Sequence, residues 1–278
     1  QNKFSEATET FMQALAIFPD QPETLCNLGV LLRNQGKYDA AEEALRKAIA
    51  LQPKFAEFHF NLGNTLKSRC DLDAALECYQ QTLSLEPNNA DAHWNKAQIL
   101  LLLGRLKEGW EEYEWRKKCA DFSLLVWQPG GPPWDGSDLN GKTILIYCEK
   151  GLGDSIQFIR YAQLLAKMGA QVFVKCQPKL QVLFKTIPGV DRAITRSDKS
   201  VPYHFQASLL SLPCLLKTDI ETIPAQVPYL FLPTQTSREL ISEGKLKIGI
   251  VWAGSSSHKN DQHRSMSLKY FEPLFYNK

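Results

Sequence analysis

The sequence predicts an α plus α/β protein, in which a helical α-solenoid precedes a parallel α/β domain. Within the first 120 residues, small residues and prolines recur every 34 residues, which indicates stacked helical hairpins. From Thr143 onward, short apolar or alternating runs separate helical stretches, as in proteins built on a parallel sheet. The length of 278 residues accommodates about two domains of ordinary globular composition.

The repeat is carried by three equivalent tripeptides, Asn27-Leu28-Gly29, Asn61-Leu62-Gly63 and Asn95-Lys96-Ala97, with a proline at positions 19, 53 and 87. The small third residue lets the first helix of each hairpin approach the second, and the proline ends the second helix. Such hairpins cannot bury their apolar faces alone and stack into a solenoid. The period and pattern resemble the tetratricopeptide repeat. Residues 1–20 then correspond to the second helix of an earlier repeat, so we expect the chain to begin inside a repeat.

The third repeat ends in an aromatic segment, "EGWEEYEWRKK", over residues 108–118. Trp110, Tyr113 and Trp115 could form a stacking surface for a ligand, or they could dock the last helix on the following domain. Aromatic stripes on helices are usually packed, which favours docking. A connector rich in proline and glycine follows, and we expect its Trp127 and Trp134 to pack as well.

The α/β part contains strand candidates at 143–148, 170–176, 191–195, 203–209 and 247–254, and helix candidates at 154–168, 178–186, 208–217 and 235–243. This alternation predicts a Rossmann-like parallel domain. The strand at 247–254 and the stretch "SLKYFEPLF" are interpreted as the first strand and helix of a further domain. The predicted organisation is a solenoid at 1–120, a connector at 121–142, an α/β domain at 143–243 and the incomplete start of another domain at 244–278.

Charge and composition exclude several classes of function. A net charge of +2 argues against a nucleic-acid or membrane surface, and no apolar run is long enough for a transmembrane helix. The amphipathic N-terminus is not a signal peptide. Seven scattered cysteines indicate neither a disulfide framework nor a zinc site, and no other metal-ligand spacing is present. We therefore expect structural cysteines, no metal and a cytoplasmic protein.

The first candidate site is the glycine turn Gly151-Leu152-Gly153-Asp154 after the first strand. It is not a dinucleotide fingerprint, because Ile156 replaces the third glycine. In one interpretation Asp154 caps the following helix and forms a capping box with Gln157. In the other, Asp154 is a general base, and Gly151, Gly153, Ser155 and Gln157 contact a substrate at the carboxyl end of the strand.

The second candidate site is the polar loop "WAGSSSHKNDQHRS" over residues 252–265. Its backbone amides, hydroxyls and cations could bind a phosphate. The alternative is an ordinary solvated connection. The candidate phosphate ligands are Gly254, Ser255, Ser256, His258, Lys259, Asn260 and Arg264.

Together, the repeats, "GWEEYEWR", "PPWDGSDLNGKTILIYCEKGLGDSIQFIRYAQLL" and "IGIVWAGSSSHKNDQHRSMSL" resemble bacterial tetratricopeptide proteins fused to a heptosyltransferase-like domain of glycosyltransferase family 9. The resemblance implies two Rossmann-like domains around a cleft, the first binding acceptor and the second a nucleotide-sugar. It implies Asp154 as the base and Gly254, Ser255, Ser256, His258 and Lys259 as donor contacts. The His-Lys-Asn-Asp run departs from the single-lysine pattern of true heptosyltransferases, which argues against ADP-heptose.

Two functions follow as hypotheses. The first is transfer of a sugar from a nucleotide-diphosphate donor to a protein or glycan acceptor, without a cofactor, with the repeats binding a protein partner or acceptor. Most of the donor-binding domain would lie beyond residue 278, so we expect the present chain to be inactive by itself. The alternative is a non-catalytic scaffold whose repeats bind a partner protein.

Overall fold

The computed structural model describes residues 2–123, 129–149, 151–198, 201–231, 250–251, 253–254 and 265–273. The predicted helix at 235–243, Trp127 and most of the polar loop at 252–265 lie outside these ranges. The chain divides into two compact units, residues 1–233 and 234–278. The first unit contains the repeats and a parallel sheet.

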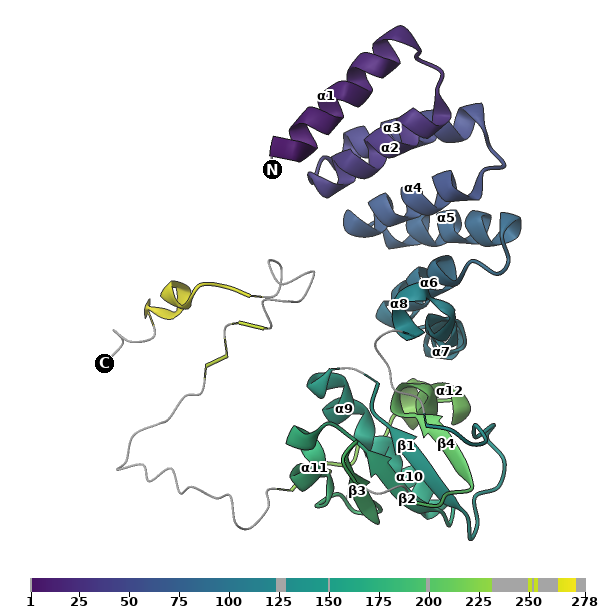
Figure 1. The fold of residues 1–278 in the computed structure, drawn as a ribbon, viewed down its shortest axis with the longest axis vertical. Coiled ribbons are helices and arrows are strands. Elements are labelled where there is room, and N and C mark those ends of the chain that lie inside the picture. Colours follow the sequence, from purple (N-terminus) through teal and green to yellow (C-terminus); the bar gives the residue numbers. More distant parts are fainter. Residues whose placement is uncertain are drawn as a thin grey trace. The chain divides into compact units, whose positions relative to one another are not determined.

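Helical hairpins form the first part of this unit, as the periodicity predicts (Figure 1). The helix α1 precedes the hairpins α2/α3, α4/α5 and α6/α7, and a 3₁₀ helix η1 and a short helix α8 end the array. The bounds are α1 Asn2–Ile17, α2 Pro22–Asn34, α3 Tyr38–Leu51, α4 Ala56–Ser68, α5 Leu72–Leu85, α6 Ala90–Leu102, α7 Leu106–Tyr113, η1 Glu114–Lys118 and α8 Ala120–Ser123.

Close contact between paired helices explains the regular spacing of small residues along the sequence. A Cβ atom added to Gly29 would lie 2.6 Å from Leu45 Cγ, and one added to Gly63 would lie 2.8 Å from Tyr79 Cε1. Both distances are below van der Waals contact, so each position requires glycine. The prediction that these glycines permit close helix packing is confirmed.

The second part of the unit is a sheet of parallel strands in the order β3-β2-β1-β4. Each strand lies inside a predicted strand segment. Tyr147 at the end of β1 is in register with Lys175 of β2 and Ser208 of β4, so the carboxyl ends of these strands are level. The strand bounds are β1 Thr143–Tyr147, β2 Gln171–Lys175, β3 Arg192–Ile194 and β4 Phe205–Ser208.

The connections of the sheet are shorter helices than the sequence pattern predicts. The helix expected at 154–168 is two α-helices separated by a 3₁₀ turn, and the one expected at 208–217 begins as 3₁₀, with Pro213 in the first turn of its α-helical part. The bounds are α9 Leu152–Phe158, η2 Ile159–Tyr161, α10 Ala162–Lys167, α11 Pro178–Phe184, η3 Leu209–Ser211, α12 Leu212–Leu215 and η4 Ile220–Thr222.

Apolar side chains cover both faces of the sheet, as expected for parallel strands. Ile144 and Ile146 of β1 belong to the larger core, whereas Leu145 points to the other face and packs with Phe173. The connector contributes Trp134, which is 3% exposed and belongs to the larger core. Its backbone N–H donates to the Gln206 carbonyl of β4 at 2.8 Å. The predicted packing of Trp134 is thus confirmed.

One expectation for the second unit is wrong where its residues are described. Residues 250, 251, 253 and 254 do not form a strand, and Val251 is 91% exposed. A strand needs a hydrogen-bonded neighbour, and none is paired with these residues in the described part of the chain. Of the helix expected over 267–275, the described residues form a 3₁₀ helix, η6 Leu268–Phe271, and residue 273 is helical again, while residues 274 and 275 lie outside the described part of the chain.

Candidate functional site

The corner between β1 and α9 brings the glycine turn to the carboxyl end of the sheet. β1 is followed by Cys148 and Glu149, and α9 begins at Leu152 with Gly151 as its N-cap residue. Gly151 has an extended backbone, with φ −54° and ψ 149°, and provides no side-chain cap. Ligands of parallel α/β sheets bind at this end of the strands.

Asp154 lies in the first turn of α9, two residues inside the helix. The interpretation of Asp154 as the N-cap, with a capping box to Gln157, is therefore wrong. The helix starts earlier because Gly151 can adopt the N-cap conformation without a side-chain acceptor. The carboxylate still stands near the positive end of the helix dipole, which stabilises its negative charge.

The other residues predicted around Asp154 differ in their surroundings. A Cβ atom at Gly151 would lie 3.1 Å from Asp154 Oδ2, whereas one at Gly153 would meet no atom within 4 Å. Ser155 is buried, and its hydroxyl donates to the Gly151 carbonyl at 2.9 Å. Gln157 is exposed on α9. A substrate could therefore approach the turn at Gly153, whereas Ser155 is packed inside the protein.

Asp154 contributes to the wall of a pocket of about 400 Å³ between the last repeat and the sheet. Trp94 of α6 and Tyr113 of α7 form its aromatic side, with ring centroids 4.8 Å apart. Burial raises the pKa of Tyr113 to about 12, so this phenol stays neutral and can act as a hydrogen-bond donor. The lining consists of Asp91, Trp94, Tyr113, Arg116, Cys119, Phe122, Glu149, Asp154 and Leu210.

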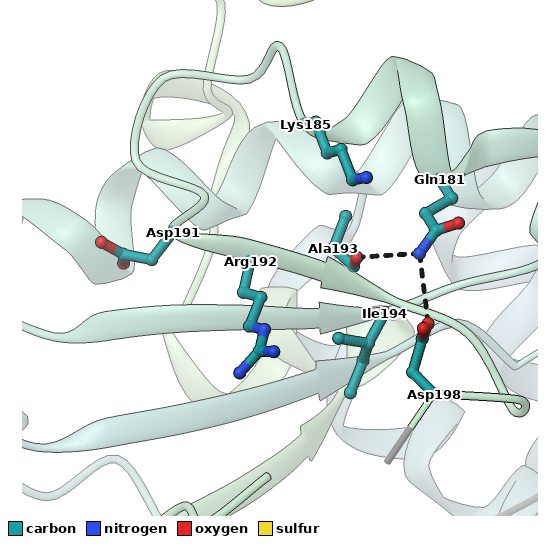
Figure 2. Close-up of a pocket in the computed structure, with 7 residues that line it drawn as sticks. All are labelled: Gln181, Lys185, Asp191, Arg192, Ala193, Ile194 and Asp198. Atoms are coloured by element: carbon teal, nitrogen blue, oxygen red, sulfur yellow. Dashed lines mark hydrogen bonds between the residues drawn. The ribbon is translucent and has the colours of Figure 1, made fainter. Parts of the chain in front are cut away.

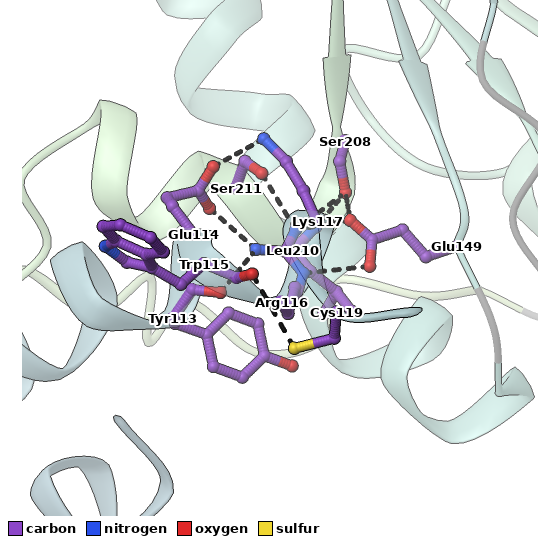
Figure 3. A network of polar contacts seen from close by, with 10 residues as sticks. All are labelled: Tyr113, Glu114, Trp115, Arg116, Lys117, Cys119, Glu149, Ser208, Leu210 and Ser211. Atoms are coloured by element: carbon purple, nitrogen blue, oxygen red, sulfur yellow. Dashed lines mark hydrogen bonds and ion pairs between the residues drawn. The ribbon is translucent and has the colours of Figure 1, made fainter. Parts of the chain in front are cut away.

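Two of the lining residues, Arg116 and Glu149, form a buried ion pair, which Figure 3 shows with its polar neighbours. The Arg116 side chain is 4% exposed and that of Glu149 is 1% exposed. Arg116 Nε donates to Glu149 Oε2 at 3.0 Å, and Nη2 donates to Glu149 Oε1. The arrangement is the bidentate form in which a guanidinium binds a carboxylate most strongly.

Further bonds tie this pair to three elements. Arg116 Nη2 donates to Ser211 Oγ at 2.9 Å, Nη1 donates to Glu114 Oε1 at 2.8 Å, and Ser208 Oγ donates to Glu149 Oε1. Burial alone would lower the pKa of Arg116, but the hydrogen bonds and charges of Glu149 and Glu114 outweigh burial and raise it. Arg116 thus links the repeats to the ends of β1 and β4. Sequence reasoning missed this pair.

Within the aromatic segment, Trp110 packs on the sheet side, as the docking interpretation predicts. Trp110 of α7 meets Phe158 of α9 edge to face, with centroids 5.7 Å apart at 89°. Trp115 turns back and stacks on His93 of α6 at 3.8 Å. These rings are therefore packed within the protein.

A second pocket, of about 300 Å³, lies at the carboxyl ends of β1 and β2. Lys175 and Gln177 line it. Burial, and to a smaller extent the charge of Arg196, lowers the pKa of Lys175. Burial also raises the pKa of Cys148 to about 11 and that of Cys176 to about 12, so both thiols stay protonated and are poor nucleophiles.

A third pocket, of about 460 Å³, lies at the β3 edge and contains none of the predicted site residues (Figure 2). Gln181 of α11 donates to the Ala193 carbonyl at 3.2 Å and to Asp198 Oδ2 at 3.1 Å. Asp198 in turn accepts from the Thr195 backbone N–H at 2.6 Å, and this bond lowers the pKa of Asp198. These bonds hold the turn after β3 in place.

The predicted phosphate loop lies almost entirely outside the described residues. Of its candidate ligands only Gly254 is described, and its N–H donates to Ser265 Oγ at 2.8 Å. The roles of Ser255, Ser256, His258, Lys259, Asn260 and Arg264 stay predictions. No helix in the described parts of the chain has both the length and the apolar character needed to span a bilayer.

Comparison with protein families identifies residues 22–55 and 56–89 as tetratricopeptide repeats. These are the hairpins α2/α3 and α4/α5, so the predicted repeats are confirmed. Tetratricopeptide solenoids present extended surfaces that bind protein partners.

Among curated proteins, FlbA of Caulobacter vibrioides is 38% identical over 100 residues, which is 34% of this chain and 17% of FlbA. The match therefore spans about a sixth of that relative. Among solved structures, MamA superposes with a TM-score of 0.40 and 25% identity over 43% of this chain and 70% of MamA. An O-GlcNAc transferase mutant of Thermobaculum terrenum gives a TM-score of 0.39 and 22% identity over 67% of this chain and 36% of that protein.

Proposed function

We propose that this chain is the acceptor-side part of a glycosyltransferase that moves a sugar from a nucleotide-diphosphate donor to a polypeptide acceptor held by the repeats. The observation that carries the proposal is the position of Asp154. Asp154 is exposed and lines a pocket of about 400 Å³ at the carboxyl end of β1. The resemblance to glycosyltransferase family 9 assigns the role of base to this same aspartate.

The pocket supplies groups suited to this reaction. Asp154 would accept the proton of the acceptor hydroxyl while its oxygen bonds to the anomeric carbon of the sugar. The bond from that carbon to the diphosphate would break, and the diphosphate would leave with the electron pair. Tyr113, kept neutral by its raised pKa, and Trp94 could orient the acceptor. The polar loop after residue 253 is proposed to stabilise the leaving diphosphate.

Replacing Asp154 by Asn tests the proposed base. The substitution preserves size and hydrogen bonding but removes the proton acceptor. Using the natural full-length protein and radiolabelled UDP-, GDP- and ADP-sugars, we expect wild-type transfer to be lost while the circular dichroism spectrum is retained. Asp135→Asn on the exposed connector is the matched control and should transfer like the wild type. Full activity of Asp154→Asn would refute the assignment.

A scaffold is the second candidate, because residues 22–89 match tetratricopeptide repeats, and solenoids of this kind can bind partners without any catalytic group. Nucleotide binding separates the two functions. A saturable rise in melting temperature with one nucleotide-sugar would favour the transferase, since a ligand that binds only the folded state stabilises it. A full-length protein that ignores all three donor classes would favour the scaffold.

A further inference from the structure

Among the described residues, two cations at equivalent positions of adjacent repeats have no acidic partner. Arg33 of α2 and Lys67 of α4 are separated by one 34-residue repeat, and both are partly buried. Other partly buried cations of the repeats are paired. Arg69 lies 2.7 Å from Glu42, and Lys96 lies 2.7 Å from Glu112. Among the described residues, Arg33 and Lys67 contact no carboxylate.

Lys67 is held by neutral groups. Its Nζ donates to Asn95 Oδ1 at 2.9 Å and to Gln98 Oε1 at 3.0 Å, both on α6. Asn95 in turn donates to Asn64 Oδ1 at 3.1 Å. Burial lowers the pKa of Lys67 to about 8. The ammonium is thus oriented by amides, which do not neutralise its charge, and it keeps one N–H for another acceptor.

Arg33 is less satisfied still. Its Nη1 is fully buried and has no hydrogen-bond partner in the described part of the protein, so a ligand can reach only the part of the Arg33 side chain that is exposed. Burial lowers the pKa of Arg33, while the nearby Tyr79 and Cys26 oppose this shift. Tyr79 cannot serve as a counter-ion, because burial raises its own pKa well above the ordinary value. Its hydroxyl already donates to Asn64 Oδ1 at 2.8 Å.

A partly desolvated cation without a counter-ion is costly, and an anion placed beside it recovers that cost. We propose that Arg33 and Lys67 bind the acidic side chains of an extended polypeptide that lies across α2 and α4. The two cations occupy the same position of their helices, eleven residues after Pro22 and Ala56, and so face the same side of the solenoid.

The spacing and chemistry favour a peptide over another polyanion. Helices α2 and α4 contact each other, and packed helices lie about 8–10 Å apart. A polyproline II segment places every third side chain on one face at intervals of about 9 Å. The amides of Asn64, Asn95 and Gln98 beside the cations suit peptide groups. A nucleic acid would instead need a longer row of cations.

This inference rests on the polypeptide-binding role given to the repeats in the proposed function, but not on sugar transfer. The binding experiment therefore contains no donor. If the peptide does not bind, the assignment of Asp154 as the base is unaffected. If no sugar is transferred, the peptide-binding experiment still tests Arg33 and Lys67.

The probe is a fluorescein-labelled peptide of repeated Glu-Pro-Ala triplets. Its binding to the full chain is measured by fluorescence anisotropy. The matched probe is Gln-Pro-Ala, which has the same shape without charge. We expect saturable binding of the Glu peptide and affinity lower by about tenfold or more for the Gln peptide. Equal affinities, or no binding of either, would overturn the proposal. Tighter binding of an oligothymidine than of the Glu peptide would overturn the assignment to a peptide.

Charge removal locates the site. Arg33→Met and Lys67→Met together should weaken Glu-peptide binding about tenfold or more, while Lys47→Met, on the exposed side of α3, should change it less than about twofold. If the double variant does not fold, the wild type provides the test through pH. The amides facing Lys67 do not titrate, so affinity should fall as pH rises through about 8. A flat profile up to pH 10 would contradict the role of Lys67.

Discussion

Arg116, at the end of the last repeat, and Glu149, after the first strand, form a bidentate ion pair from which water is almost completely excluded. The pair fixes the loop that leads to Asp154 on two sides, through the repeats and through β4. Removing either side chain alone would leave the other charge buried without this partner.

Removing one member of this pair should be strongly destabilising. Glu149→Gln leaves the buried Arg116 with Glu114 as its remaining counter-ion, so we expect the free energy of unfolding to fall by about 3 kcal/mol, the low end for a broken buried ion pair. Urea denaturation followed by circular dichroism measures the change. Arg116→Met should cost a similar amount, and the double variant should lose less than the sum of both. Strict additivity would show that the two side chains do not interact.

Enlarging Gly63 should destabilise the second repeat. The new methyl group of Gly63→Ala would lie 2.8 Å from Cε1 and 3.0 Å from Cδ1 of Tyr79, a ring with no exposed surface. We expect a loss of about 1–3 kcal/mol in urea denaturation, as for overpacked cores. Gly153→Ala is the control, because its methyl group would enter open space on a helix and alanine favours helices. A stable Gly63→Ala protein would contradict the packing at this position.

Replacing Cys70 by glycine should stabilise the protein. Cys70 has φ 68°, in the left-handed region, and occupies the turn position that Gly36 and Gly104 hold in the other repeats with φ 76°. A residue with a side chain is strained by about 1–2 kcal/mol in this conformation. Glycine relieves that strain, but its greater freedom in the unfolded chain offsets about half of the gain in stability. Thermal unfolding should show a gain of about 0.5–1 kcal/mol. Gly36→Ala, which introduces the same strain, should lose about as much.

The stability of the repeats should depend on pH through Lys67. Its pKa is about 8 in the folded protein and 10.5 when unperturbed, because burial disfavours the charged form. Between these values the unfolded chain binds a proton that the folded chain lacks, so unfolding free energy rises with pH. Below pH 8 the full penalty of the buried charge is present, and above 10.5 it has disappeared. Lys67→Met should lack this rise, whereas Lys47→Met should retain it.

The periodic parts of the fold could be predicted because local pattern and packing agree. Gly29 and Gly63 indicate close helix pairs, and the structure places Leu45 and Tyr79 against them. The strand segments were also located, since β1 is apolar on both faces. Their helices were predicted too long, because a 3.6-residue pattern continues through 3₁₀ turns such as η2.

The site was less predictable. A capping pattern placed the start of α9 at Asp154, but Gly151 begins the helix through its backbone alone. The Arg116–Glu149 pair joins residues 33 positions apart, and pairing over such a separation leaves no periodic signal. One clue was present: an arginine inside an otherwise packed aromatic segment requires a buried acceptor.

The connector has a consequence for self-association. Pro132 accepts from the Gln206 N–H at 2.9 Å, and Trp134 donates to the Gln206 carbonyl, so the outer backbone groups of β4 at this point are already used. Strand addition by another chain would therefore be directed to β3. That strand has only the residues Arg192–Ile194, and it begins with a cation. Short edge strands that carry a charge disfavour the addition of strands from other chains. Edge-to-edge aggregation of this sheet should therefore be slow while the connector covers β4.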